Sequence, residues 1–384
     1  MDLERLTGHW DAAGLRFSIV ERDGDYVMVD PSTPAGFEPT LRSVGSDRVR
    51  IATGPYSGAE LAVEEDGDGE IGLSMGGAIP ATRLAVPPER EPGSGLTLPP
   101  LRLTDRQDAQ FSRIWEEIRA AGDGRVVDDP SPAPLDRFVR WLKERETVIF
   151  HGSNDPEIDV FEPVRRSMEL RDHAGRGNLG AVYGTHDGIW SMFFAVVDRS
   201  RLKGSIRNGV GTYHRRGGGE TIDVYHFSIA DVVLEDRPYT TGALYLLPRD
   251  AFTRVPFYPG GPPSNEWACQ TTVEPLARLV VEPSDFPFLD SIGGHDDGPL
   301  IEFGRIGDEV YAGVVTARRT DDGIEIVTRA DRDAVDRLIE MSREIYPDVV
   351  RVAADHPDGT AVRMTGPPAF VQGMERRLRD HLGD

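Results

Sequence analysis

The sequence predicts a multidomain α+β protein: an N-terminal all-β module, a central β-rich domain and a small C-terminal α+β unit. Three observations predict this class. The chain has 384 residues, enough for two or three domains at roughly 100–200 residues each. Short runs that alternate apolar and polar residues fill residues 1–86, and helix-period patterns follow within residues 87–145. Strand-like and helix-like runs then share residues 146–297 and 298–384.

Composition excludes several classes of protein. Asp and Glu number 65 against 43 Lys and Arg, a net charge of -22, which disfavours nucleic acid as a general partner or acceptor. No apolar run approaches the roughly 20 residues of a membrane span, so we expect no membrane partner. The start MDLERLTGHW lacks the pattern of a secretory signal. The single cysteine, Cys269, excludes an internal disulfide framework and fits a cytoplasmic protein.

The N-terminal module is predicted from alternation and turns. Runs such as LRFSIV, DYVMVD, RVRIAT and AELAVE alternate apolar and polar residues and are separated by DG, SD and DGDG. That pattern is typical of antiparallel hairpins, and we expect about six strands. The acidic cluster at 64–70 lacks the spacing and closing Glu of a calcium-binding loop. We interpret it as a solvated hairpin tip.

A linker and two amphipathic helices connect this module to the centre. Residues 87–100 are rich in Pro and Gly. Thr104 and Gln107 form a capping-box pair at the start of the first helix. The second helix follows Pro134. The apolar stripes predicted for these helices comprise Phe111, Ile114, Trp115 and Ile118 in the first, and Leu135, Phe138, Val139 and Leu142 in the second.

Beyond residue 146 the predicted elements are mostly strands. TVIFHGS, GAVYGT, DVYHFSIADVVL, GALYLLP and ARLVVEP are typical of strands or strand ends. In the C-terminal unit we expect strands over 310–317, 324–328 and 349–352. A helix with Val335, Leu338 and Ile339 on one face should precede the last of these strands, and a final helix should cover 368–382.

Unusual polar residues lie at the ends of three central strands. The first strand ends in His151, Gly152 and Ser153, where the glycine lets a ligand approach and its neighbours can form hydrogen bonds. Tyr183 ends the second and offers a ring for stacking. Glu266 opens an apolar third strand, where a carboxylate is costly to bury without a partner or a task. Taken singly, these features also fit a strand exit, a core aromatic and an exposed edge carboxylate.

In this order, the three features resemble the His-Tyr-Glu signature of ADP-ribosyltransferases of the poly(ADP-ribose) polymerase-like, or diphtheria-toxin-like, branch. That family has HGS or HGT on its first strand, Tyr at the end of its second, and Asn-Glu-Tyr at the start of its third. The matching letters here are HGS from His151, Tyr183, and NEW from Asn265. The resemblance covers residues 148–289 and implies a split β-sheet catalytic domain over 146–297.

The resemblance also implies a role for each residue in binding NAD as substrate, without a metal. His151 would bond the adenosine-side ribose, and Gly152 with Ser153 would hold the nicotinamide carboxamide. Tyr183 would stack on the nicotinamide ring. Glu266 would bind the 2′-hydroxyl of the nicotinamide ribose and steady the developing charge. The opposite wall of the ring site would come from one of two aromatic residues, Phe194 or Phe193.

The chemistry of NAD is consistent with a carboxylate at that place. Nicotinamide is a cationic leaving group, and its departure creates an oxocarbenium-like sugar that a carboxylate stabilises mainly in the transition state. We therefore predict an NAD-dependent ADP-ribosyltransferase and favour transfer of a single unit to an unknown acceptor. The alternatives are an NAD glycohydrolase and a catalytically silent module that binds NAD, ADP-ribose or a protein partner. The acidic charge disfavours the related RNA 2′-phosphotransferases.

Two rival motifs carry less weight. Gly175, Gly177 and Gly180 spell GxGxxG, but the dinucleotide fingerprint needs a strand before it and a helix after it. Here a strand-like run follows, so we interpret the segment as a glycine-rich loop beside the site. The histidines of this region lack HxxxH or HxH spacing, which disfavours a zinc site. These histidines are His173, His186, His214 and His226.

Basic residues gather between positions 199 and 216 of this acidic chain. They run into Gly217, Gly218 and Gly219, and we expect a mobile, solvated loop. The functional alternative is a cationic lip for the NAD pyrophosphate or an acidic target, since guanidinium groups pair well with phosphate oxygens. The cluster comprises Arg199, Arg201, Lys203, Arg207, His214, Arg215 and Arg216.

Overall fold

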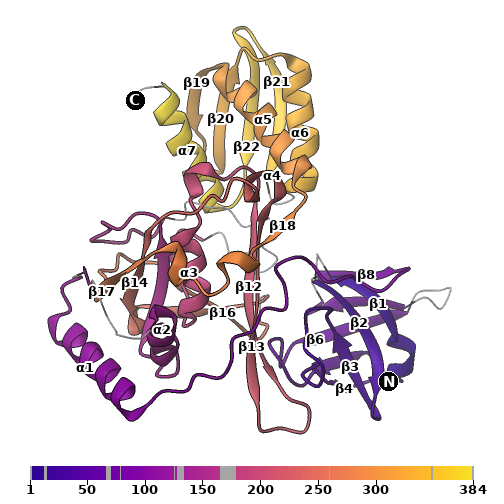
Figure 1. Cartoon of the computed structure of the whole chain (residues 1–384). Coiled ribbons are helices and arrows are strands. Elements are labelled where there is room, and N and C mark those ends of the chain that lie inside the picture. Colours follow the sequence, from indigo (N-terminus) through magenta and orange to yellow (C-terminus); the bar gives the residue numbers. More distant parts are fainter. Residues whose placement is uncertain are drawn as a thin grey trace.

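The computed structural model describes residues 2–12, 15–65, 71–77, 79–124, 126–127, 134–164, 179–258, 260–346 and 349–382. Helices and strands are mixed, so the predicted α+β class is confirmed. A β-rich N-terminal module and a C-terminal unit lie on different sides of a central region, and the long ribbon of β12 (Ile206–His214) and β13 (Thr221–Ala230) runs beside the N-terminal module (Figure 1). None of the described helices is long and apolar enough to cross a membrane.

The N-terminal module is one antiparallel sheet of eight strands, in the order β3-β2-β1-β8-β7-β6-β5-β4. A bridge between Val27 and Thr40 brings the two outer strands together, so the sheet nearly closes into a barrel around Trp10 and Phe17. Two more strands form than the expected six, because elements as short as β4 carry no readable alternation. The strands are β1 (Gly8–Ala12), β2 (Leu15–Arg22), β3 (Asp25–Val29), β4 (Leu41–Ser43), β5 (Arg48–Ile51), β6 (Glu60–Glu65), β7 (Ile71–Met75) and β8 (Ile79–Leu84).

The connecting segment contains α1 (Asp105–Ala121) and α2 (Leu135–Lys143). The predicted capping box is confirmed: the Gln107 amide donates to Thr104 Oγ1 at 3.3 Å, and Gln107 Oε1 accepts from the Thr104 amide at 3.1 Å. The predicted stripes face the core, although Ile114 is only partly buried. Periodicity was sufficient here because capping and amphipathic packing are local to each helix.

The central region contains three sheets, ordered β10-β14-β17-β9, β11-β16-β15 and β12-β13-β18. The first two sheets are joined by paired backbone hydrogen bonds between Phe150 and Thr185. The helices are α3 (Gly188–Val196) and α4 (Asp231–Leu234). The strands are β9 (Val126–Val127), β10 (Val148–Ser153), β11 (Val182–Gly184), β12 (Ile206–His214), β13 (Thr221–Ala230), β14 (Gly242–Pro248), β15 (Thr253–Pro256), β16 (Pro263–Cys269), β17 (Ala277–Val281) and β18 (Gly293–His295).

The tip of the β12–β13 ribbon is docked on the N-terminal barrel. Arg216 forms ion pairs with Asp23 at 3.2 Å and with Glu38 at 3.3 Å, and the Glu38 side chain is 1% exposed. The Arg215 guanidinium lies over the Phe37 ring, 4.7 Å from its centroid. Acidic groups of the barrel therefore hold Arg216, which removes this residue from the predicted cationic lip, while Arg215 pairs with Glu220 of the ribbon at 2.7 Å and stays about half exposed.

The C-terminal unit is a four-stranded antiparallel sheet, ordered β19-β20-β22-β21, whose apolar core it shares with three helices. Val310 lies in a helix, not in the strand expected over 310–317, which begins only at Val314. The run VYAGVVTA is apolar and rich in β-branched residues, and it is too short for the spacing of its apolar residues to distinguish a helix from a strand. The elements are α5 (Gly298–Ala312), β19 (Val314–Arg319), β20 (Gly323–Thr328), α6 (Arg332–Ile345), β21 (Val350–His356), β22 (Gly359–Thr365) and α7 (Pro368–Leu382).

Candidate functional site

The three strands that carry the predicted site residues are neighbours. β11 lies between β10 and β16: it meets β10 at the bridge between Phe150 and Thr185 and pairs with β16 from Val182 to Gly184. β10 continues beyond the bridge to Ser153, paired there only with β14 among the described strands. The two sheets therefore share one junction. His151 comes directly after it on β10, and Tyr183 comes two residues before it on β11.

His151 is held at this junction. Its Nδ1 atom lies 2.7 Å from the Tyr183 main-chain oxygen, and its ring centroid lies 4.8 Å from that of Phe161. A carbonyl oxygen only accepts hydrogen bonds, so Nδ1 carries the proton and Nε2 presents a lone pair. Among the described residues no hydrogen-bond partner of Nε2 is found. Burial lowers the His151 pKa to about 4, so the ring is neutral near pH 7.

Tyr183 and Glu266 lie on one face of the paired strands. Tyr183 pairs with Ala268 across β11 and β16. Because side chains alternate along a strand, Glu266, two residues before Ala268, shares the face of Tyr183. The Tyr183 hydroxyl accepts a hydrogen bond from the Leu179 amide at 3.0 Å. Both residues are partly buried.

The same alternation separates Gly152 from His151. Continued from the bridge between Phe150 and Thr185, it puts Gly152 on the face of Tyr183 and Glu266, and His151 on the opposite face. The structure thus brings together Gly152, Tyr183 and Glu266. His151 contacts this group through the Tyr183 carbonyl and not through a shared face.

Gly152 lies directly against α3. A Cβ atom at this position would be 1.9 Å from the Ser191 main-chain oxygen, so only glycine permits this close approach. The Ser191 hydroxyl also donates to the Phe150 oxygen at 3.1 Å, which ties α3 to β10. Ser153 is partly buried, and its hydroxyl accepts from the Asp155 amide at 3.1 Å.

Of the two aromatic residues expected to form the opposite wall, Phe193 is excluded. Its side chain is 0% exposed and packs against Phe227 and Phe286 in the central core. Phe194, the next residue of α3, is partly buried, and the Arg199 guanidinium lies 5.4 Å from its ring centroid. Phe194 stays the candidate for the predicted wall, because adjacent residues on a helix point in different directions and only Phe193 is buried in the core.

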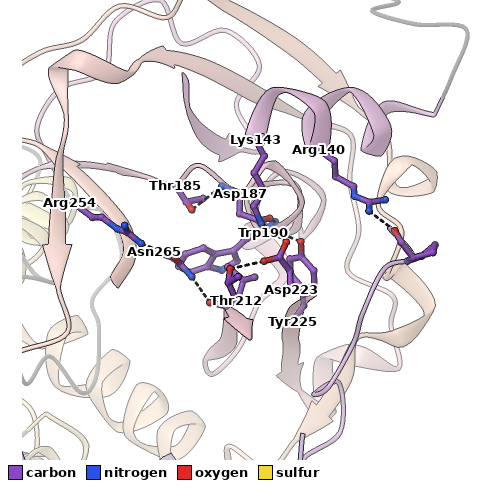
Figure 2. Close-up of polar contacts among 12 residues, drawn as sticks. Arg140, Lys143, Thr185, Asp187, Trp190, Thr212, Asp223, Tyr225, Arg254 and Asn265 are labelled. Carbon is purple, nitrogen blue, oxygen red and sulfur yellow. Dashed lines mark hydrogen bonds and ion pairs between the residues drawn. The ribbon is translucent and has the colours of Figure 1, made fainter. Parts of the chain in front are cut away.

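Asn265 anchors the start of β16 next to Glu266. Its amide nitrogen donates to the Val210 oxygen of β12 at 2.8 Å, and its side-chain oxygen accepts from Arg254 at 3.2 Å. Arg254 also donates to the Ser264 oxygen at 2.6 Å. Figure 2 shows Asn265 between Arg254 and the ribbon, near Trp190 of α3. These bonds fix the backbone from which Glu266 projects.

A lysine bridges two carboxylates beside α3. Lys143 Nζ lies 2.7 Å from Asp187 Oδ2 and 2.6 Å from Asp223 Oδ2 (Figure 2). Burial lowers the Lys143 pKa, but the two carboxylates outweigh burial and raise it above its ordinary value. The lysine is therefore charged, and it joins α2, the start of α3 and the β12–β13 ribbon.

Asp187 also caps α3. Its Oδ1 atom accepts from the Trp190 amide at 2.8 Å, and its Oδ2 atom accepts from the Tyr225 hydroxyl at 3.0 Å. Its side chain is 3% exposed, so every one of these bonds satisfies a group removed from water. No motif in the sequence points to this network as a whole. An Asp just before an apolar helix is an N-cap signal, but its partners come from distant segments.

The rival motifs lie partly outside the described part of the chain. Gly175, Gly177 and His173 lie outside the described residues, and a strand follows Gly180 rather than the helix of a dinucleotide fingerprint. No group of three or more potential ligands suited to a metal ion occurs among the residues described.

No protein-family model, curated protein or solved structure matches this chain. The resemblance to ADP-ribosyltransferases therefore stays a prediction, and what this chain does is inferred from its own residues.

Proposed function

We propose that the protein is an NAD-dependent ADP-ribosyltransferase that uses the junction of β10, β11 and β16. The observation that carries the proposal is the adjacency of these three strands, with Tyr183 and Glu266 on one face and His151 bonded to the Tyr183 carbonyl. Residues separated by more than a hundred positions in the sequence thus lie on neighbouring strands, with Tyr183 and Glu266 on one face and His151 on the other.

His151 supports the proposal through its fixed tautomer. Its Nδ1 proton is committed to the Tyr183 carbonyl, and the ring is neutral because burial lowers its pKa to about 4. Nε2 is then an acceptor and suits a hydroxyl donor such as a ribose hydroxyl. Its role is to orient the nucleotide rather than to transfer a proton.

Tyr183 and Glu266 would act on the nicotinamide end. The Tyr183 ring offers a stacking surface, whereas Gly152 beside it is packed against α3 and not open to a ligand. Glu266 would accept a hydrogen bond from the 2′-hydroxyl of the nicotinamide ribose. As the glycosidic bond breaks, nicotinamide leaves as a neutral molecule with the bonding pair, and the carboxylate stabilises the cationic sugar. The acceptor then bonds to the anomeric carbon and loses a proton to solvent.

Labelled NAD tests the proposal directly. Label on a macromolecule or small acceptor after incubation supports transfer, and mass spectrometry of cell extract would identify the acceptor. Free ADP-ribose as the sole product would replace transfer with hydrolysis. Unchanged NAD with measurable binding would leave only a binding module.

The substitution Glu266→Gln tests the mechanism. It should lower turnover by about 10²–10³-fold while NAD affinity and the unfolding temperature stay close to those of the parent protein. Glu274→Gln is the matched control, because Glu274 is an exposed glutamate shortly after β16, and it should leave turnover unchanged. Near-normal turnover of Glu266→Gln would contradict the proposed role.

A further inference from the structure

A cavity of about 290 Å³ lies on the β12-β13-β18 sheet, and neither His151 nor Glu266 lines it. It is formed on the face of β13 opposite to Phe227 and Ile229, which point into the central core. The polar and charged residues around it are Glu91, Arg207, Ser228, Asp231, His295 and Asp296.

The floor of this cavity is polar and rigid. Ser228 and His295 are 1% and 8% exposed, and Ser228 Oγ lies 2.9 Å from His295 Nδ1. On the other side of the ring, Nε2 lies 3.2 Å from Ser205 Oγ and 3.5 Å from Asp297 Oδ2. The carboxylate keeps a proton on Nε2, so Nδ1 accepts from the Ser228 hydroxyl. Two buried polar side chains thus present a fixed surface to the cavity.

Glycines hold the walls in place. The linker crosses the sheet at Gly93, where a Cβ atom would lie 2.0 Å from the Phe227 oxygen of β13. On β18, a Cβ atom at Gly293 would lie 2.2 Å from the carbonyl carbon of Pro92 in the linker. At Gly294 a Cβ atom would lie 1.9 Å from Asp231 Oδ1. The Asp231 carboxylate therefore occupies the space that any larger residue at 294 would fill.

The rim carries an excess of negative charge. Glu91 has its nearest cationic partner in His226 at 3.8 Å, and burial lowers the His226 pKa, so that ring is neutral near pH 7. Asp231 forms no ion pair with any residue that the structure describes. The Asp296 side chain accepts from the Gly298 amide at 2.9 Å, and the Asp296 main-chain oxygen accepts from Arg207 at 3.5 Å. Arg207 is 3.9 Å from Asp297, which offsets part of its charge.

We propose that this cavity binds a small organic amine, with its ammonium group between Glu91, Asp231 and Asp296 and its other end near Ser228. Three carboxylates around one cavity repel one another, and an ammonium ion relieves that repulsion while donating charge-assisted hydrogen bonds. The volume is near the lower end for ligand sites, which suits a molecule of a few carbons.

Titration calorimetry with putrescine, without NAD, tests the site. The wild-type protein should show one saturable site at millimolar or lower putrescine. Glu91→Gln and Asp231→Asn should each weaken binding by about tenfold. The matched control is Asp250→Asn, since the Asp250 side chain is fully exposed and does not line the cavity. This variant should bind putrescine with the same affinity as the wild-type protein.

Gly294→Ala separates a local site from general attraction to an acidic protein, because it displaces the Asp231 carboxylate and leaves the net charge unchanged. It should weaken putrescine binding while thermal unfolding shows a folded protein. Equal affinity of wild type, Glu91→Gln and Asp231→Asn, or no saturable binding by wild type, would overturn the proposal. Because no NAD is present, neither result bears on transferase activity.

Discussion

The Nδ1 atom of His151 lies 2.7 Å from the main-chain oxygen of Tyr183. Together with the backbone bridge between Phe150 and Thr185, this hydrogen bond joins two strands through residues that are 32 positions apart in the sequence. It also sets the tautomer of the imidazole. A substitution that removes it would therefore disturb both the junction and any ligand that bonds to Nε2.

The low pKa of His151 predicts a pH dependence of stability. Burial lowers this pKa from 6.5 to about 4 in the folded protein. Between these values the unfolded chain binds a proton that the folded protein does not, so stability falls as pH falls from 6.5 toward 4. The loss attributable to His151 is at most about 3 kcal/mol.

Urea unfolding of wild type and His151→Gln at pH 6.5 and 4.5 measures this effect. Other buried histidines contribute equally to both proteins. The difference between the two proteins in how much the free energy of unfolding changes from pH 6.5 to 4.5 therefore isolates the contribution of His151. If the free energy of unfolding changes with pH by the same amount in both proteins, His151 binds a proton as readily in the folded protein as in the unfolded chain.

Gly152→Ala should destabilise the protein by about 3 kcal/mol or more, because the new methyl group would overlap the Ser191 oxygen of α3. Gly209→Ala on β12 is the control, since a Cβ atom there has no neighbour within 4 Å. Thermal unfolding of both variants provides the comparison. Similar melting temperatures would mean that α3 does not press on β10.

Lys143→Met should cost about 3 kcal/mol of unfolding free energy, because Asp187 and Asp223 would face each other without a cation. Lys203→Met, at an exposed lysine, should change stability by less than about 0.5 kcal/mol. Adding Asp223→Asn to Lys143→Met should restore part of the loss. If the double variant is no more stable than the single one, charge repulsion is not the cause.

Arg216→Met should loosen the contact between the ribbon tip and the barrel, because the buried Glu38 loses one of its two arginine partners. We expect a loss of about 2 kcal/mol and faster proteolysis near the tip. Arg215→Met removes the same charge from a residue whose carboxylate partner, Glu220, is half exposed, so it should cost less than about 1 kcal/mol. Equal proteolysis rates for the two variants would argue against a docked tip.

Local signals predicted the helices well where each helix carries its own cap and stripe. Thr104 and Gln107 mark the start of α1, and α7 spans Pro368–Leu382 as expected. α5 was missed because Gly304 and Gly307 interrupt its apolar pattern, while Val314 and its neighbours suggest a strand. Its identity as a helix depends on packing against α6, which no short window of sequence contains.

The candidate site, too, could be predicted from the sequence only in part. The strand ends that carry His, Gly, Ser, Tyr and Glu could be predicted from the sequence alone, because such residues are unusual at the ends of apolar runs. Which of these residues share a face could not be predicted. The register of β11 on β16 places Tyr183 and Glu266 on one face, and the bridge between Phe150 and Thr185 places His151 on the other.

By itself, the sequence determined the acidic charge, the mixed class and the positions of the polar strand ends, because these depend on composition and on periods of a few residues. Only the tertiary structure decided that Phe193 belongs to the core, that Arg216 belongs to a domain contact, and that Lys143 meets Asp223 across 80 positions. A charged or aromatic side chain takes its role from what packs against it, and those partners are chosen by sheet register and domain docking.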